Sequence, residues 1–208
     1  MKRRRALDLV LIALTSPVWI PTMTAIALGV AVTSGRPVFF RQERIGYNGE
    51  IFVMLKFRSM RNGKNPLIPD PTRITRIGSV LRRTSLDELP QLLNVIRGDM
   101  SLVGPRPILP EQLTFMTQQQ LQRHRVLPGL TGLAQVNGRN SVSWDERFDY
   151  DLTWARHPSI SRYLTIVFRT FATVATASGI GGHDPNDRLL IDLNEPHATK
   201  GHHDQASR

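Results

Sequence analysis

The sequence predicts a small α/β domain attached to a membrane, and three observations support this fold class. A long apolar segment follows a run of four basic residues near the N-terminus. Two short β-rich runs flank an Asn-Gly turn, which is typical of a β-hairpin. Several later stretches repeat apolar residues at helical spacing. The chain has 208 residues, enough for one domain with a hydrophobic core and too few for two domains of ordinary size.

The apolar segment covers residues 6–32 and contains one charged residue, Asp8. It is long enough to reach across a bilayer or deep into it. Pro17 and Pro21 each remove a helix hydrogen bond and bend the helix, and the Ser16 hydroxyl can donate to a carbonyl left without a partner. Three interpretations stay open: a spanning anchor, a re-entrant bent helix and a cleaved signal peptide. Length favours the anchor, whereas basic residues on both flanks favour the re-entrant helix, whose two ends share one side of the membrane.

A short β-hairpin is expected next. Residues 38–40 and 51–55 are β-rich, and the turn sequence at residues 47–50 contains Asn-Gly. Residues 61–73 are polar and contain three prolines, which predicts a loop.

The clearest helix is expected over residues 84–96. Ser85 is a suitable N-cap and Gly98 is placed to end the helix, whereas Pro90 either bends it or shifts its start. Two further helices are expected at residues 111–125 and 143–155.

The last expected helix covers residues 163–174. Its sequence is apolar with basic flanks, which suits a core helix and a membrane-interface helix equally well. Residues 181–208 are polar and hold four of the six histidines, without the regular spacing of a metal site. They are expected to form a disordered tail.

Cysteine content and charge limit the chemistry. The chain has no cysteine, which excludes disulfides, Cys-ligated zinc, iron–sulfur clusters and a thiol nucleophile. The net charge is +10, and because residues 181–208 carry three basic and five acidic side chains, residues 1–180 carry +12. A surface this basic suits phosphate-bearing partners, which are nucleic acid, an anionic membrane, or nucleotide and lipid phosphates.

The pair Asp87-Glu88 is the first candidate for chemistry. One interpretation is structural, because Ser85 and Glu88 fit a capping box at a helix N-terminus. The other is functional, because the carboxylates lie among four arginines in the sequence and could hold Mg²⁺ against a diphosphate or attack phosphorus. Adjacent carboxylates do not suit glycoside hydrolysis, which needs two carboxyls on opposite sides of a sugar. The four arginines are Arg82, Arg83, Arg97 and Arg106.

Two loops are further candidates. In Gly104-Pro105-Arg106-Pro107, the prolines restrict the backbone around Arg106, which suits phosphate capture, although a solvated arginine on a rigid loop would look the same. Residues 128–140 are rich in glycine and could approach a ligand closely or form simple turns. They lack the pattern of a P-loop.

Four blocks of sequence together resemble the bacterial sugar transferases, also called monotopic phosphoglycosyl transferases, in their minimal catalytic form. The resemblance covers about residues 5–180. The blocks are LKFRSM at residues 55–60, SLDELPQLLNV at 85–95, RGDMSLVGPRP at 97–107 and PGLTGLAQVNGR at 128–139.

The resemblance implies a reaction. The family transfers a sugar 1-phosphate from a UDP-sugar to undecaprenyl phosphate, releases UMP and uses Mg²⁺, as the first membrane step of glycoconjugate biosynthesis. Asp87 matches the family's nucleophile, which forms a covalent phosphosugar intermediate and is also expected to contact the metal, and Glu88 matches its partner. The substrate-binding positions implied by the match are Lys56, Arg82, Arg106, Arg139 and Asp151.

The resemblance also implies a topology. Ser16 and Pro17 match the family's helix break, so the re-entrant helix becomes the leading interpretation, with both ends in the cytoplasm and the site on the cytoplasmic face of the bacterial inner membrane. The expected division is a re-entrant helix at residues 1–35, a phosphoglycosyl transferase domain at 36–180 and the tail at 181–208. Partners are then the UDP-sugar, undecaprenyl phosphate and the bilayer, with no nucleic acid, and self-association is left open.

Two positions depart from the family pattern. Many members carry Asp-Leu-Lys where this chain has Tyr163-Leu164-Thr165, and an aromatic residue is frequent at the position of Leu133. The chain therefore has a tyrosine in place of the family's acid at position 163, and Leu133 is expected to alter the sugar pocket.

Two rival functions follow from the same residues. A membrane-anchored basic protein that binds nucleic acid or lipid without catalysis would explain the charge, but the aromatic residues make up 7% of the chain and do not alternate with the basic runs as base stacking requires. The other rival is a transferase that uses a different nucleotide sugar and lipid.

Overall fold

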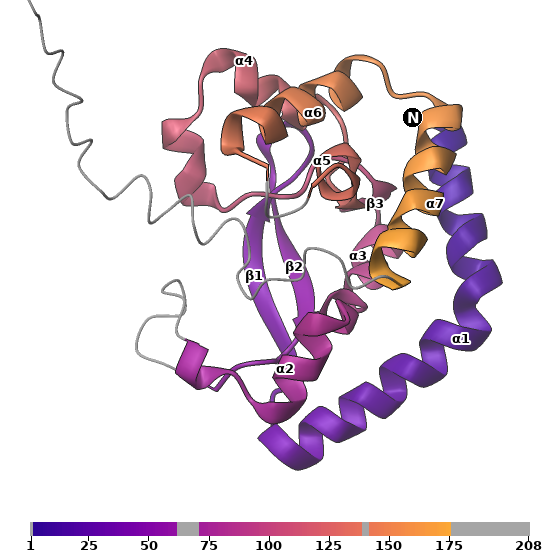
Figure 1. Ribbon diagram of the computed structural model, residues 1–208, viewed down its shortest axis with the longest axis vertical. Helices are drawn as coiled ribbons and strands as arrows, with labels where there is room; N and C mark the ends of the chain where they lie inside the picture. Colours follow the sequence, from indigo (N-terminus) through magenta and orange to yellow (C-terminus); the bar gives the residue numbers. More distant parts are fainter. Residues whose placement is uncertain (1, 62–70, 139–141, 176–208) are drawn as a thin grey trace, which may run out of the picture.

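The computed structural model describes residues 2–61, 71–138 and 142–175, and it confirms the α/β class (Figure 1). A two-stranded hairpin and a second, very short strand pair lie among the helices. The helices are α1 Lys2–Ser34, α2 Arg76–Arg83, α3 Gln91–Arg97, α4 Gln118–Leu121, α5 Leu133–Val136, α6 Trp144–Arg156 and α7 Ile160–Ala175. The strands are β1 Phe39–Ile45, β2 Ile51–Phe57, β3 Ser101–Val103 and β4 Gly129–Thr131.

The expected hairpin is present and longer than its β-rich cores. Strands β1 and β2 pair antiparallel from Phe39 opposite Phe57 to Ile45 opposite Ile51. The turn between them uses Asn48 with φ 54°, a left-handed conformation that asparagine tolerates well. Strands β3 and β4 form the second pair and run parallel.

Helix α1 extends along one side of the molecule and takes part in all three hydrophobic clusters. Ile12 and Val30 are buried in two of them, while Leu7 and Leu11 pack against the third, which includes residues of α7. The opposite face of α1 exposes many apolar side chains, among them Leu14, Val18, Leu28 and Val32. The helix is long and apolar enough to cross a membrane by length and composition, and its exposed face suits contact with lipid.

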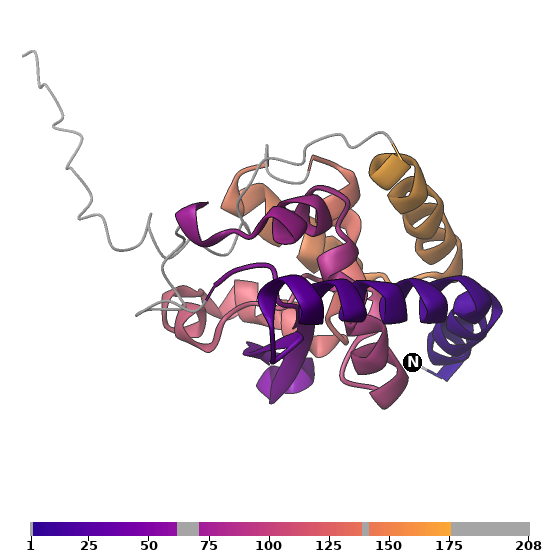
Figure 2. The same ribbon diagram turned by 90° about the horizontal axis from the view of Figure 1, so that it is seen from below.

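Helix α1 is bent near its middle, and Figure 2 shows its two segments at an angle. Pro17 has no N–H to donate to the carbonyl of Ala13, four residues earlier, and the hydroxyl of Ser16 donates to that carbonyl at 2.7 Å instead. The indole N–H of Trp19 donates to the carbonyl of Ile12 at 2.9 Å. Side chains thus supply hydrogen bonds where the bend disturbs the helix, as a helix inside a bilayer requires.

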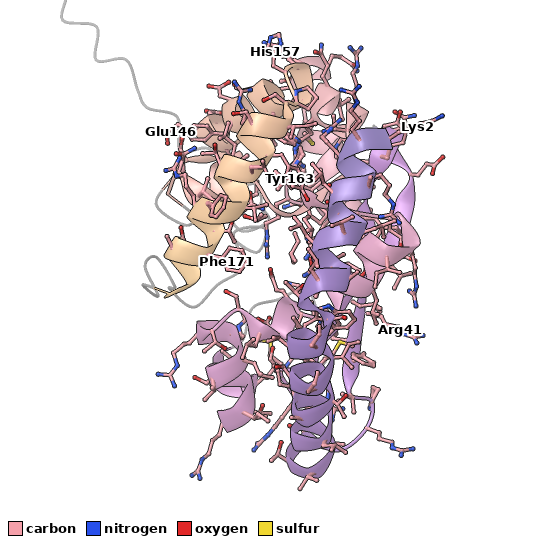
Figure 3. The ribbon with its side chains drawn as sticks, turned by 90° about the vertical axis from the view of Figure 1, so that its right-hand side faces the viewer. Lys2, Arg41, Glu146, His157, Tyr163 and Phe171 are labelled. Atoms are coloured by element: carbon pink, nitrogen blue, oxygen red, sulfur yellow. The ribbon has the colours of Figure 1, made fainter. Side chains whose placement is uncertain are left out.

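The single charge of the apolar segment is buried against the rest of the domain. The carboxylate of Asp8 accepts hydrogen bonds from the Ser101 hydroxyl at 2.8 Å, the Leu102 amide at 2.9 Å and the Tyr163 hydroxyl at 2.7 Å. In Figure 3, Tyr163 lies between α7 and α1. The tyrosine that departs from the family pattern therefore ties α7 to α1.

The helix expected over residues 84–96 is divided in two. Residues 86–88 form a 3₁₀ turn, and α3 begins at Gln91, directly after Pro90. Proline is favoured at a helix start because it has no N–H to donate, so it shifts the start. The end is as predicted, since Gly98 caps α3 with φ 97°.

The helix expected over residues 111–125 is also wrong as a single element. The chain forms a 3₁₀ segment at Pro110–Phe115, then α4, then a second 3₁₀ segment at Gln122–Arg125. Thr117 interrupts the helix because its side chain caps the amide of Gln120 and starts a new one.

Helix α6 confirms the helix expected over residues 143–155, with Ser143 and Glu146 forming its capping box. Helix α7 has features of both a core helix and a membrane-interface helix, the two interpretations of its sequence. Tyr163 and Ile166 are buried in the core, whereas Phe168 and Phe171 are 73% and 67% exposed. One face packs against the domain and the other presents apolar side chains, as in a helix at a membrane surface.

If the bend in α1 makes the helix re-entrant, both of its ends lie on the same side of the membrane, and labelling can test this. Because the chain has no cysteine, Lys2→Cys and Arg36→Cys variants each report one end of the helix by labelling. We expect an impermeant maleimide to label neither cysteine in intact spheroplasts and both after the membrane is opened. Replacing Pro17 and Pro21 together with leucine is expected to straighten the helix and expose the Lys2→Cys label outside. Labelling of Lys2→Cys without the proline changes would contradict the re-entrant topology.

Candidate active site

Asp87 and Glu88 lie in the 3₁₀ turn at Leu86–Glu88, between α2 and α3. Ser85, which precedes them, has φ 58° and ψ 15°, a left-handed conformation that is uncommon outside glycine. Its side chain makes no capping hydrogen bond, so the capping box suggested by the sequence is wrong. Backbone strain of this kind is often found at functional sites.

Glu88 is held by two cations. Its Oε1 atom accepts from Lys56 Nζ at 3.0 Å and from Arg106 Nη2 at 2.6 Å, and Arg106 Nη1 lies 3.5 Å from Oε2. Lys56 comes from β2 and Arg106 from the loop after β3. Charge-assisted hydrogen bonds of this length fix the carboxylate in one orientation. Glu88 therefore binds two cations at once and does not cap a helix.

Asp87 is 8% exposed, and burial raises the pKa of its carboxyl to about 6. This value already includes the neighbouring charges, of which Glu88 raises the pKa and the cations Lys56, Arg82 and Arg106 lower it. The resulting carboxyl is ionised above pH 6 and more basic than an ordinary aspartate. A carboxylate of this kind, among cations that would attract phosphate, is suited to attack on phosphorus.

The structure brings most of the predicted site residues together. Asp87, Glu88, Lys56 and Arg106 form one cluster, and Arg82, at the end of α2, acts on Asp87 through its charge. Asp151 lies elsewhere, buried on α6 in an ion pair with Arg123. Arg139 lies outside the described residues.

Two residues that shape the site, Arg123 and Gly104, were not predicted to have a role of their own, although Gly104 begins the candidate loop around Arg106. Arg123 lies in a run of basic residues in a 3₁₀ segment, where nothing local distinguishes it from its neighbours. Nor does the sequence explain why a glycine stands at position 104. In the structure, Gly104 packs against the backbone of Leu127, Pro128 and Gly129, with no room for a side chain. Such approaches between distant backbone segments leave no local pattern.

The donor atoms at the Asp87-Glu88 pair suit a magnesium ion in part. Among the described residues there is no group of three or more His, Cys, Asp or Glu side chains able to form a complete protein site. Mg²⁺ commonly uses one or two carboxylates and completes its shell with water and substrate phosphates. Asp87 fits that arrangement, because the oxygens of Glu88 already bind cations.

A bent apolar helix, a domain packed on it and a buried carboxylate pair among cations together suit a membrane-associated protein that acts on phosphate-bearing substrates. The family model described as bacterial sugar transferase matches residues 1–177, and the chain belongs to that family. This family is membrane-associated, and α1 is long and apolar enough to serve as the anchor.

Two of the relatives described here match the chain over most of their length, and a third matches it over about a third of its own length. The chain is 43% identical over 173 residues to the sugar transferase EpsL of Bacillus subtilis (strain 168), covering 82% of this chain and 84% of that one. The exopolysaccharide production protein ExoY of Sinorhizobium fredii is 39% identical, covering 85% and 87%. The UDP-glucose:undecaprenyl-phosphate glucose-1-phosphate transferase of Xanthomonas campestris pv. campestris is 45% identical, over 74% of this chain but 35% of its own length.

Proposed function

We propose that the protein transfers a sugar 1-phosphate from a UDP-sugar to undecaprenyl phosphate and releases UMP, as the first membrane step of glycoconjugate biosynthesis. The observation that carries the proposal is the buried Asp87 carboxyl beside Glu88, which Lys56 and Arg106 hold. The reaction named for several relatives supports the choice of substrates.

The first half of the proposed reaction uses Asp87 as the nucleophile. A carboxylate oxygen of Asp87 attacks the phosphorus that bears the sugar, and the bond from that phosphorus to the bridging oxygen breaks. UMP leaves with the bonding electrons, and the sugar phosphate stays on Asp87 as an acyl phosphate. Ionisation of Asp87 above its pKa of about 6 keeps the nucleophile active at neutral pH.

The second half returns the enzyme to its starting state. A phosphate oxygen of undecaprenyl phosphate attacks the same phosphorus, and the bond to Asp87 breaks. No bond at the anomeric carbon changes, in agreement with carboxylates that are adjacent in sequence and therefore unsuited to flank a sugar. Lys56, Arg82 and Arg106 supply positive charge around the phosphates, and Glu88 keeps Lys56 and Arg106 apart and oriented.

The proposal includes Mg²⁺ and the membrane. Asp87 would hold the ion together with diphosphate oxygens, and the bound ion would neutralise charge on the departing UMP. The exposed apolar faces of α1 and α7 would keep the site at the cytoplasmic face of the inner membrane, where a lipid phosphate is within reach.

The test uses the full chain in lipid nanodiscs with Mg²⁺, undecaprenyl phosphate and individual UDP-sugars. We expect UMP as the nucleotide product with at least one sugar. Without the lipid acceptor, the intact mass of the protein is expected to rise by one sugar phosphate. Release of UDP in place of UMP would exclude this reaction, and retention of anionic lipid without any nucleotide product would favour the non-catalytic binding protein.

A further inference from the structure

The loop that carries Arg106 is held at four successive carbonyl groups. The four donors come from three parts of the chain, namely β1, the 3₁₀ segment Gln122–Arg125 and β4, and they are two backbone amides and two buried arginines. The pairs are Pro105 with the Gly129 amide at 2.9 Å, Arg106 with Arg123 Nη2 at 2.6 Å, Pro107 with Arg44 Nη1 at 3.4 Å, and Ile108 with the Ile45 amide at 2.9 Å. The loop is therefore tied to the rest of the domain on both sides of Arg106.

The donor to the Arg106 carbonyl is itself fixed by a buried acid. Arg123 and Asp151 are 3% and 4% exposed. Nε and Nη2 of Arg123 both donate to Asp151 Oδ2, at 3.0 and 2.6 Å, and Nη2 also reaches the Arg106 carbonyl. The guanidinium also lies over the ring of Phe148, 5.8 Å from its centre. Asp151 on α6 thus determines where Arg123 can point.

Stability of the fold does not by itself explain a buried ion pair of this kind. Removing two charges from water is costly, and apolar side chains of similar volume often stabilise a fold at least as well. The pair does something that apolar side chains cannot do, because its guanidinium donates to a backbone carbonyl that would otherwise lack this partner. The carbonyl belongs to Arg106, whose side chain binds Glu88.

We propose that Arg123 and Asp151 are positioning residues for the transferase reaction, which hold the Arg106 loop so that the Arg106 guanidinium stays on Glu88 beside Asp87. The inference rests on the proposed function for its catalytic consequence. It gives Asp151, predicted from the sequence to bind substrate, an indirect role through Arg123. Small displacements of a group that stabilises charge in a transition state have large effects on rate, so the pair is expected to act on kcat more than on KM.

The first test compares two conservative variants with matched controls. Arg123→Lys keeps the charge but cannot span both Asp151 and the Arg106 carbonyl, and Asp151→Asn keeps the shape of the acid. We expect each variant to lower kcat about 10- to 100-fold, which is the range found when a residue that orients a functional group is removed. KM should change less than about threefold. The controls Arg125→Lys and Asp149→Asn lie two residues away, are exposed, and are expected to keep wild-type kinetics.

A double-mutant cycle separates positioning from a general effect. If Arg123 acts through Arg106, adding Arg123→Lys to Arg106→Ala should cost little beyond the loss already caused by Arg106→Ala. Multiplication of the two losses would overturn the proposal. Unfolding of both Arg123→Lys and Asp151→Asn at assay temperature would also overturn it, because the pair would then serve the fold as a whole.

A readout without turnover distinguishes this inference from the proposed function. Hydrogen exchange of the peptide that covers residues 104–110 should become faster in Arg123→Lys and Asp151→Asn and stay unchanged in the controls. Faster exchange in a protein that forms no UMP would support the loop's positioning while the proposed reaction fails. Unchanged exchange in a protein that does form UMP would overturn the positioning role alone.

Discussion

Replacing Asp87 with asparagine is expected to abolish UMP formation and at the same time to stabilise the protein above pH 6. Asparagine has nearly the same shape, but its amide cannot form the acyl phosphate. We expect the rate of UMP release to fall by at least about a thousandfold, the scale seen when a catalytic nucleophile is removed. Intact mass after incubation with UDP-sugar should show no added sugar phosphate.

The gain in stability follows from the raised pKa of Asp87. The carboxyl has a pKa of about 6 in the folded protein and about 3.9 when unfolded, so the folded state binds the proton more tightly. Stability conferred by the protonated form is therefore lost as pH rises from about 4 through 6, and the ionised form remains costly above that range. The asparagine side chain of the Asp87→Asn variant is neutral at every pH, and we expect it to add on the order of 3 kcal/mol at pH 8.

Thermal unfolding of metal-free protein at pH 8 and pH 5 tests this prediction. The melting temperature of the Asp87→Asn variant should exceed that of the wild type at pH 8, and the difference should shrink at pH 5, where the wild-type carboxyl is largely protonated. Asp145→Asn, an exposed acid on α6, is the control and should give no such difference. If the melting temperatures of the variant and the wild type differed by the same amount at both pH values, burial would not raise the pKa of Asp87.

The parts of the fold that the sequence predicts well are those that local signals determine. The Asn-Gly turn, the glycine at the end of α3 and the capping box of α6 each act within a few residues. The Ser85 and Glu88 pair shows the limit of such signals. It matches a capping box, yet Glu88 binds Lys56 and Arg106, which are 32 and 18 residues away. Two charge-assisted bonds outweigh one cap.

The sequence predicts which residues form the site, but it does not predict the long-range contacts that hold them in place. Resemblance to the family selected Asp87, Glu88, Lys56 and Arg106, and the structure brings these four together. Sequence patterns could not reveal that Asp8 ties α1 to the domain, because the groups that bind Asp8 lie 93 to 155 residues further along the chain. The role of Arg123 was missed for the same reason, since it depends on a carbonyl in another loop.

The second large effect is expected from Gly104→Ala. A Cβ at Gly104 would collide with the carbonyl oxygen of Leu127, lie 2.8 Å from the Gly129 amide nitrogen and lie 3.0 Å from the carbonyl carbon of Pro128. All three contacts are backbone atoms, which cannot rotate away as a side chain can. The β3–β4 pair must therefore separate, and we expect a loss of about 3 kcal/mol in the free energy of unfolding, at the upper end for overpacking.

Gly29→Ala in α1 is the matched control. There a Cβ meets the Cδ1 atom of Ile77 at 3.0 Å, the end of a flexible side chain, and alanine favours the helix. Thermal unfolding should show a large drop in melting temperature for Gly104→Ala and little change for Gly29→Ala. A Gly104→Ala variant as stable as the wild type would mean that β3 and β4 do not approach as closely as the structure has them.

Gly104→Ala also tests whether the fold and the chemistry depend on the same contact. Gly104 donates its amide to the Thr131 carbonyl and lies two residues before Arg106, so any separation of β3 from β4 moves the loop that binds Glu88. At a temperature where the variant is still folded, we expect UMP formation to fall at least about tenfold, because a displaced Arg106 weakens the charge array around Asp87. Arg106→Ala should remove the same contribution without the loss of stability. Gly104→Ala displaces the Arg106 guanidinium, whereas Arg106→Ala removes it. Comparing their rates of UMP formation therefore shows how much of the effect of Arg106 depends on its position.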